Sequence, residues 1–267
     1  MKIPLLFVFY TWYNFLGDMM KKKIRNLIFF IIELILIATI IFSAAKIVKW
    51  TINNKKNKEI VNKISKNINV IENDNEDKED KYKIDFKNLK EQNNDVVAFI
   101  KVNGTNIEYP VVKGTDNSFY LNHSFDKSYN SFGWIFANYS NIFDGSDKNI
   151  TLFGHAMRDG SMFGSLKNVL TDDWHNNTEN LSIIFITEKE TSLYQVFSTY
   201  KVEAESYYIN NNFNSDEDYI DFLNKIKSRS NYDYNVDLTK DDQILTLSTC
   251  YTNNKYRIVL HAKKISE

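Results

Sequence analysis

Cysteine, proline and glycine are scarce in this sequence. Its 267 residues include one Cys, two Pro and eight Gly. A single Cys excludes an intrachain disulfide framework and a cysteine-rich zinc site. So little Gly and Pro excludes collagen-like and proline-rich architectures. The four His residues show no metal-ligand spacing, so the sequence predicts no metal site.

An excess of charge of either sign is also absent. Lys and Arg together number 33 and Asp and Glu 34, which leaves a formal net charge of -1. Without a basic field, nucleic acid is not an expected partner. Apolar residues make up 43% of the chain and aromatic residues 15%, which is enough for a packed core. The length allows one or two domains.

One long hydrophobic run stands near the N-terminus, at residues 27–45. It carries a single charge, Glu33. About 20 apolar residues are needed to cross a bilayer as a helix, so we predict a transmembrane signal-anchor. The small residues 43–45 leave a cleaved signal peptide as the alternative. Basic residues flank the run on both sides, so the positive-inside rule does not decide its orientation.

The chain on either side of this run differs in composition. Residues 1–20 are apolar but short for a span, and we interpret them as a disordered extension or an overlong reading frame. Residues 21–26 form a basic flank. Residues 46–81 are rich in Lys, Asn, Asp and Glu, which predicts a polar stalk. Apolar residues at spacings of three and four predict an amphipathic helix in part of that stalk.

The globular domain is predicted over residues 82–267, where β-rich segments alternate with turn residues. The expected strands are 96–102, 106–112, 133–138, 149–155, 181–187, 193–202, 243–250 and 256–265. One late helix is expected over 216–228, because Ser215 is a good N-cap and acidic residues fill the first turn. Many strands, little helix and no βαβ alternation favour a β-barrel or a sandwich.

Cys250 ends one of these strands and is followed by a polar loop. Strand alternation places Ser248 and Cys250 on the face opposite the neighbouring leucines. If this strand pairs with the last one as a hairpin, Arg257 lies near Cys250, where a guanidinium would stabilise a thiolate or an oxyanion. Position alone leaves two readings open for each residue: a nucleophile or an inert thiol, and a catalytic or a solvated arginine.

His155 occupies a similar place, at the end of the strand 149–155 and before a polar, glycine-containing stretch. A Cys and a His at strand ends of one barrel are able to form a catalytic pair. His261 stands in the middle of a strand, which is more typical of a buried structural histidine.

Several motifs, in this order along the chain, resemble those of the class B sortases, membrane-anchored cysteine transpeptidases of Gram-positive bacteria. The matching stretches are residues 97–112, residues 116–121, the histidine motif at 153–164 and the cysteine motif TLSTC at 246–250, with Arg257 following. The resemblance covers residue 85 to the end. Ala156 departs from the pattern, which has Asn after the histidine, and the loop between Cys250 and Arg257 is short.

The resemblance implies an eight-stranded sortase-type β-barrel with N-terminal helices and one helix in the loop before the cysteine strand. It implies that Cys250 is the nucleophile, that His155 is the acid and base, and that Arg257 assists at the oxyanion. The implied substrate-binding residues are Ser248, Asn117, Leu121, Tyr208 and Ile209.

The implied reaction cleaves a C-terminal sorting motif, NPxTN-like or (S/P)PxTG-like, after Thr through a thioacyl-enzyme. The surface protein bearing that signal then passes to an amine of peptidoglycan or of its lipid-linked precursor, with neither a metal nor an organic cofactor. Such a function places residues 21–26 in the cytoplasm and the catalytic domain outside the cell. Three alternatives remain: a pilin-polymerising sortase, an inactive membrane-tethered peptide-binding module, and a papain-like hydrolase, in which Cys would precede His.

Overall fold

The computed structural model describes residues 22–66, 68–70, 82–251 and 255–265. Side chains are described over these ranges except at 22–23, 68–70 and 250–251. The predicted N-terminal extension, residues 1–20, lies outside the described residues. The chain divides into two compact units, residues 1–52 and 53–267.

In the first unit the structure describes one element, the N-terminal part of helix α2 (Lys22–Ser65). Its apolar side chains are exposed, and the helix is long and apolar enough to cross a membrane. The Thr39 and Thr51 hydroxyls donate to backbone carbonyls of preceding turns, at 2.7 and 2.9 Å. These polar groups are therefore satisfied within the helix, as a span in lipid requires.

The last part of α2, residues 53–65, belongs to the second unit. Ile64 is 2% exposed and joins the hydrophobic core of the domain. The Asn53 side chain donates to Ser131 Oγ at 2.8 Å, and Lys56 Nζ donates to Ser128 Oγ at 2.6 Å. The amphipathic pattern read from the sequence thus corresponds to a helical segment that packs on the domain.

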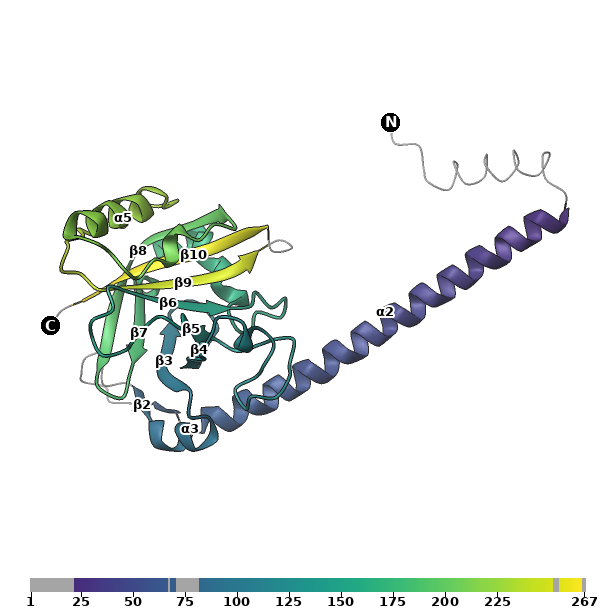
Figure 1. Cartoon of the computed structure of the whole chain (residues 1–267), viewed down its shortest axis with the longest axis horizontal. Coiled ribbons are helices and arrows are strands. Elements are labelled where there is room, and N and C mark those ends of the chain that lie inside the picture. Colours follow the sequence, from purple (N-terminus) through teal and green to yellow (C-terminus); the bar gives the residue numbers. More distant parts are fainter. Residues whose placement is uncertain (1–21, 67, 71–81, 252–254, 266–267) are drawn as a thin grey trace. The chain divides into compact units, whose positions relative to one another are not determined.

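The second unit is built around a closed barrel of eight strands (Figure 1). They are β3 (Val96–Val102), β4 (Ile107–Val112), β5 (Phe136–Ala137), β6 (Asn149–Gly154), β7 (Ser182–Ile186), β8 (Thr191–Glu203), β9 (Ile244–Tyr251) and β10 (Tyr256–Lys264). Their order around the barrel is β10-β8-β7-β3-β4-β5-β6-β9. The predicted eight-stranded barrel is confirmed. The predicted segment 133–138 contributes only the two residues of β5.

The barrel interior is filled with apolar side chains, which stabilise it by the area they remove from water. Phe99 and Ile100 of β3, Leu247 of β9 and Leu260 of β10 are fully buried. Outside the barrel, β1 (Ile68–Val70) and β2 (Tyr82–Ile84) form a separate antiparallel pair.

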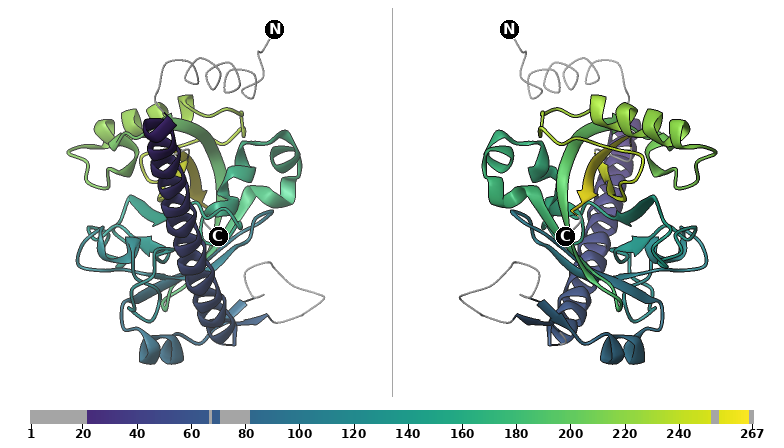
Figure 2. Two further views of the ribbon diagram at one scale, coloured as in Figure 1. Left: turned by 90° about the vertical axis from the view of Figure 1, so that its right-hand side faces the viewer. Right: turned by 90° about the vertical axis from the view of Figure 1, so that its left-hand side faces the viewer.

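Helices and turns occupy the outside of the barrel (Figure 2). The helix predicted before the cysteine strand is present as α5 (Asp216–Ser228), with the Ser215 hydroxyl accepting from Asp218 N at 3.2 Å. Its apolar stripe is buried, and the Ser198 hydroxyl of β8 donates to the Ile226 carbonyl at 2.7 Å. The remaining short helices are α3 (Phe86–Gln92), η2 (Phe119–Leu121), η3 (Gly164–Leu170), α4 (Asp172–Asn176), η4 (Thr178–Leu181) and η5 (Tyr207–Ile209).

Strand direction decides what the barrel presents at each end. Strands β6 and β9 pair in parallel, whereas β9 and β10 pair antiparallel. The C-terminal ends of β6 and β9 and the start of β10 therefore meet at one mouth of the barrel. That mouth carries the residues that the sequence analysis selected.

Candidate active site

Three backbone positions bring the predicted catalytic residues together at this mouth. Cys250 and Arg257 are directly paired across β9 and β10. Gly154, immediately before His155, is paired with Thr249, immediately before Cys250, across β6 and β9. The side chain of Cys250 lies outside what the structure describes. Its backbone register nonetheless sets it beside both predicted partners.

Among the side chains that the structure describes, the His155 ring makes one hydrogen bond. Its Nε2 lies 2.7 Å from the Leu121 carbonyl oxygen. Because a carbonyl only accepts, Nε2 carries the proton, and in the neutral ring Nδ1 is then the basic nitrogen. The His155 backbone carbonyl accepts from Met157 N at 3.1 Å and from Phe163 N at 3.0 Å, which fixes the turn after β6.

The residue before the histidine must be glycine. A Cβ at Gly154 would lie 2.9 Å from the Phe163 ring, which is fully buried. Phe163 packs beneath the histidine turn, so it cannot move aside without disturbing the His155 backbone. Packing against Phe163 thus explains why a glycine precedes the histidine in this motif.

The Leu121 carbonyl is itself positioned by a tight turn. Leu121 N donates to the Ser118 carbonyl at 3.1 Å, and Trp134 N donates to the Tyr120 carbonyl at 2.9 Å. Gly133 lies against this turn with φ +60°, and a Cβ there would stand 2.4 Å from the Tyr120 oxygen. The backbone of residues 120–121 therefore reaches the histidine only because residue 133 has no side chain.

A cleft with a cavity volume of about 440 Å³ opens at this mouth. Its lining residues are Asn117, Leu121, Phe136, Phe153, Gly154, His155, Glu205, Tyr208, Ile209, Ser248, Thr249 and Arg257. The cleft thus gathers His155, Arg257 and all five side chains predicted to bind substrate. A volume of this size suits a short peptide segment.

Hydrogen bonds preorganise the polar part of the lining. The Ser248 hydroxyl and the Tyr208 hydroxyl lie 3.1 Å apart. Asn117 donates to Asn138 Oδ1 at 3.2 Å and accepts from Tyr139 N at 3.0 Å. Leu121 and Ile209 contribute apolar surface beside these groups. The cleft therefore presents fixed hydroxyl and amide groups together with apolar patches.

Arg257 is half-buried at the start of β10 and is also paired in register with Val202 of β8. Its Nη1 donates to the Tyr256 carbonyl at 3.1 Å. A guanidinium carries five N–H donors in a rigid planar fork, and Arg257 lines the cleft beside His155.

Five lining residues were missed by the sequence analysis. Phe153, Gly154 and Thr249 lie inside the histidine and cysteine motifs, so their place beside the catalytic residues was a usable signal. Phe136 and Glu205 had no such signal, because they reach the cleft only through the pairing of β5 and the chain turn after β8. Among the described residues, no group of three or more His, Cys, Asp or Glu could hold a metal ion.

Comparison with known proteins assigns the family. The sortase domain model matches residues 100–265. The chain is 32% identical to Sortase B of Staphylococcus aureus over 238 residues, which are 88% of this chain and 96% of that protein. The chain belongs to the class B sortases.

Solved structures agree with this assignment. Sortase B from Bacillus anthracis in complex with AAEK1 is 32% identical, with a TM-score of 0.69 over 81% of this chain and all of that one. A Staphylococcus aureus sortase B–substrate complex is 35% identical, with a TM-score of 0.64 over 68% of this chain and 84% of that one. This class B sortase therefore has the fold of a sortase-type transpeptidase, with an N-terminal helix long and apolar enough to span a membrane.

Proposed function

We propose that this class B sortase is a membrane-anchored cysteine transpeptidase that cleaves a C-terminal sorting motif after Thr. The observation that carries the proposal is the register at one mouth of the barrel. Cys250 is paired with Arg257, and Gly154, next to His155, is paired with the neighbour of Cys250. Nucleophilic acyl transfer needs this combination of a nucleophile, an acid and base, and an oxyanion donor.

The first half-reaction forms a thioacyl-enzyme. The Cys250 thiolate attacks the threonyl carbonyl carbon, and the C=O electron pair moves onto oxygen. Arg257 donates hydrogen bonds to that oxyanion. The tetrahedral intermediate collapses, the C–N bond breaks, and protonated His155 gives its proton to the leaving amine.

The second half-reaction reverses these roles. An incoming amine attacks the thioester carbonyl and passes a proton to neutral His155. The C–S bond then breaks, which restores the thiolate and forms a new amide. Acid and base are thus one residue, so His155 returns to its starting state after each turnover.

The cleft lining suits an extended peptide that ends in Thr. The paired hydroxyls of Ser248 and Tyr208 and the anchored amide of Asn117 provide polar contacts. Leu121 and Ile209 provide apolar contacts for an aliphatic or prolyl side chain. We therefore assign NPxTN-like and (S/P)PxTG-like motifs on surface proteins as substrates.

The acceptor in this proposal is an amine of peptidoglycan or of its lipid-linked precursor. Transfer to this acceptor requires residues 27–45 to span the bilayer, residues 21–26 to face the cytoplasm and the barrel to face outward. The exposed apolar surface of α2 supports a location in the membrane. Residues 46–52 then lead from the bilayer to residues 53–65, which pack on the catalytic domain.

The test uses the full-length chain in detergent micelles. Quenched fluorescent peptides carrying NPQTN, SPKTG, PPKTG or a scrambled sequence are incubated with and without triglycine, and the products are identified by mass spectrometry. We expect cleavage after Thr and a triglycine adduct, both absent in Cys250→Ala. Binding without cleavage of any peptide would instead favour an inactive peptide-binding module, and transfer only to a protein lysine would favour a pilin-polymerising enzyme.

A further inference from the structure

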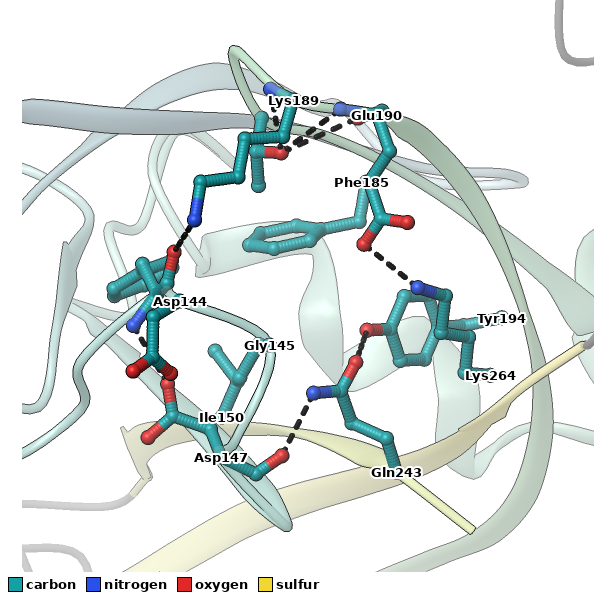
Figure 3. Close-up of a pocket in the computed structure, with 12 residues that line it drawn as sticks. Asp144, Gly145, Asp147, Ile150, Phe185, Lys189, Glu190, Tyr194, Gln243 and Lys264 are labelled. Atoms are coloured by element: carbon teal, nitrogen blue, oxygen red, sulfur yellow. Dashed lines mark hydrogen bonds and ion pairs between the residues drawn. The ribbon is translucent and has the colours of Figure 1, made fainter.

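A second cavity lies at the opposite mouth of the barrel (Figure 3). Its volume is about 380 Å³. It is bordered by the start of β6, the residue before β9, the end of β10 and the turn between β7 and β8. Because β6 and β9 run in parallel away from it, this cavity is at the far end of the strands from His155 and Cys250.

The floor of this cavity, which we call the distal pocket, is apolar. Ile150, Phe185 and Tyr194 line it and are 5%, 2% and 1% exposed. The ring of Phe185 lies across the middle of the pocket (Figure 3), 6.0 Å from the Tyr194 ring and perpendicular to it. An apolar body of modest size therefore finds a preformed surface here.

Part of the polar wall is committed to the protein itself. The Asp147 carboxylate accepts from the backbone amides of Ile142 and Phe143, at 3.0 and 2.8 Å. Gln243 donates to the Asp147 carbonyl at 2.7 Å and accepts from the Tyr194 hydroxyl at 3.0 Å. These bonds hold the pocket open in one shape, which lowers the cost of ordering it around a ligand.

The rim carries two carboxylates and two lysines. Glu190 and Lys264 form an ion pair of 2.6 Å on one side, and their side chains are 51% and 27% exposed. Asp144 and Lys189 lie on the other side (Figure 3), where Lys189 Nζ donates to the Phe143 carbonyl at 3.4 Å and the Asp144 carboxylate accepts from Ser146 N and Ser146 Oγ. The rim presents both signs within one pocket, and the Asp147 carboxylate in the wall brings the lining to three carboxylates (Asp144, Asp147 and Glu190) against two lysines.

This arrangement selects among charge classes of ligand. A net anion would meet the carboxylates as well as the lysines, and a net cation would meet Lys189 and Lys264 as well as the carboxylates, so each would be repelled as well as attracted. A molecule with one positive and one negative group finds a partner for each. The apolar floor adds a requirement for an apolar body between or beside those groups.

We propose that the distal pocket binds a small zwitterion with an apolar side chain, namely a free amino acid or a short peptide with unblocked termini. Its ammonium group pairs with a rim carboxylate, its carboxylate with Lys189, and its side chain covers Phe185. Nothing in the proposed transpeptidation uses this pocket, so its occupancy is independent of the active site.

The test is isothermal titration of the full-length chain in detergent micelles with alanyl-phenylalanine carrying free termini. We expect saturable binding. The same dipeptide acetylated and amidated should bind at least tenfold more weakly, because it lacks both charges. Alanyl-glycine should also bind at least tenfold more weakly, because it lacks the apolar body.

Two charge reversals locate the binding. Lys189→Glu should weaken binding at least fivefold, whereas Lys167→Glu, an exposed lysine outside the pocket, should leave it unchanged. Transpeptidation should be equal in both variants. Absence of saturable binding, equal affinity for the blocked dipeptide, or full affinity in Lys189→Glu would each overturn the proposal.

Discussion

The two mouths of the barrel are built from the same strands but treat their polar groups differently. At the active-site mouth, His155 is bonded to the Leu121 backbone carbonyl and lines an open cleft. At the distal mouth, Asp147, Gln243 and Tyr194 are bonded to one another in a chain. The active-site mouth thus presents reactive side chains to a substrate, whereas the hydrogen bonds at the distal mouth hold the shape of the distal pocket.

The same contrast separates two histidines of this chain. His261 lies in the barrel wall, is fully buried, and is bonded to the Tyr200 and Thr246 hydroxyls, each at 2.9 Å. Burial lowers the pKa of His261 to about 3, so this ring stays neutral. His155 is half-exposed at a strand end. His155 at a strand end is therefore available for proton transfer, whereas His261 within a strand is not.

The largest expected difference between the mouths concerns their cations. Arg257→Ala should lower kcat/KM by about 10²–10³-fold, the effect of removing one oxyanion donor. Lys264→Ala, at the distal mouth, should leave kcat/KM within about twofold. Steady-state cleavage of the best sorting peptide measures both. Equal losses in the two variants would remove the distinction between the mouths.

Two glycines with positive φ provide the next test. Gly133→Ala places a Cβ against the Tyr120 carbonyl and should displace the neighbouring Leu121 carbonyl that holds His155. We expect a loss of several kcal/mol in stability and about tenfold in kcat. Gly145→Ala meets no atom within 4 Å and should cost about 1 kcal/mol, with kcat unchanged. Denaturant unfolding and turnover are measured on both, and an active, stable Gly133→Ala would contradict the positioning role.

The buried histidine between the mouths predicts a pH dependence of stability. The pKa of His261 is lowered from 6.5 to about 3, so the unfolded state binds the proton more readily. Its stabilising contribution is complete above pH 6.5 and is lost as the pH falls toward 3. Between pH 6.5 and pH 5 the free energy of unfolding should fall by about 2 kcal/mol.

Denaturant titrations at these two pH values measure that slope, and His261→Gln should lack most of it. Carboxylates titrate mainly below this range, so they contribute little to the comparison. The same slope in wild type and in His261→Gln would show that another group is responsible.

The smallest expected effects come from two tyrosine hydroxyls. Tyr208→Phe removes the hydroxyl that is bonded to Ser248 in the cleft, and it should raise KM by about two- to fivefold, which is about 0.5–1 kcal/mol. Tyr194→Phe removes the hydroxyl that is bonded to Gln243, and it should lower stability by about 1 kcal/mol without changing KM. A KM that changes in Tyr194→Phe but not in Tyr208→Phe would contradict the assignment of the cleft as the substrate site.

The strand pattern of the sequence favoured a barrel or a sandwich, and the resemblance of its motifs to those of class B sortases implied the eight-stranded barrel. The strands that carry Cys250 and Arg257, and the strand that ends directly before His155, were predicted to within about one residue of their observed bounds. The parallel pairing of β6 with β9 was not predictable from local patterns, because it depends on how distant segments close the barrel. Glu205 and Phe136 enter the cleft for the same reason.

The distal pocket also escaped prediction, and the sequence predicted residues 53–65 only as an amphipathic helix within a stalk. Asp144, Lys189 and Lys264 are far apart in the sequence and resemble ordinary solvated charges until the barrel brings them together. Residues 53–65 resemble the polar stalk in composition, and only Ile64 and its apolar neighbours indicated a helix face that packs. The composition of a segment shows its local polarity, whereas its packing depends on which distant residues the fold places against it.

Capture of the acyl-enzyme tests the central claim most directly. Full-length protein in detergent is mixed with an NPQTN peptide in the absence of an acceptor amine, quenched in acid and analysed by intact mass spectrometry. We predict an added mass equal to the peptide fragment ending in Thr, mapped to Cys250 and discharged on addition of triglycine. Cleavage after Thr that persists in Cys250→Ala, or an adduct on another residue, would contradict the account.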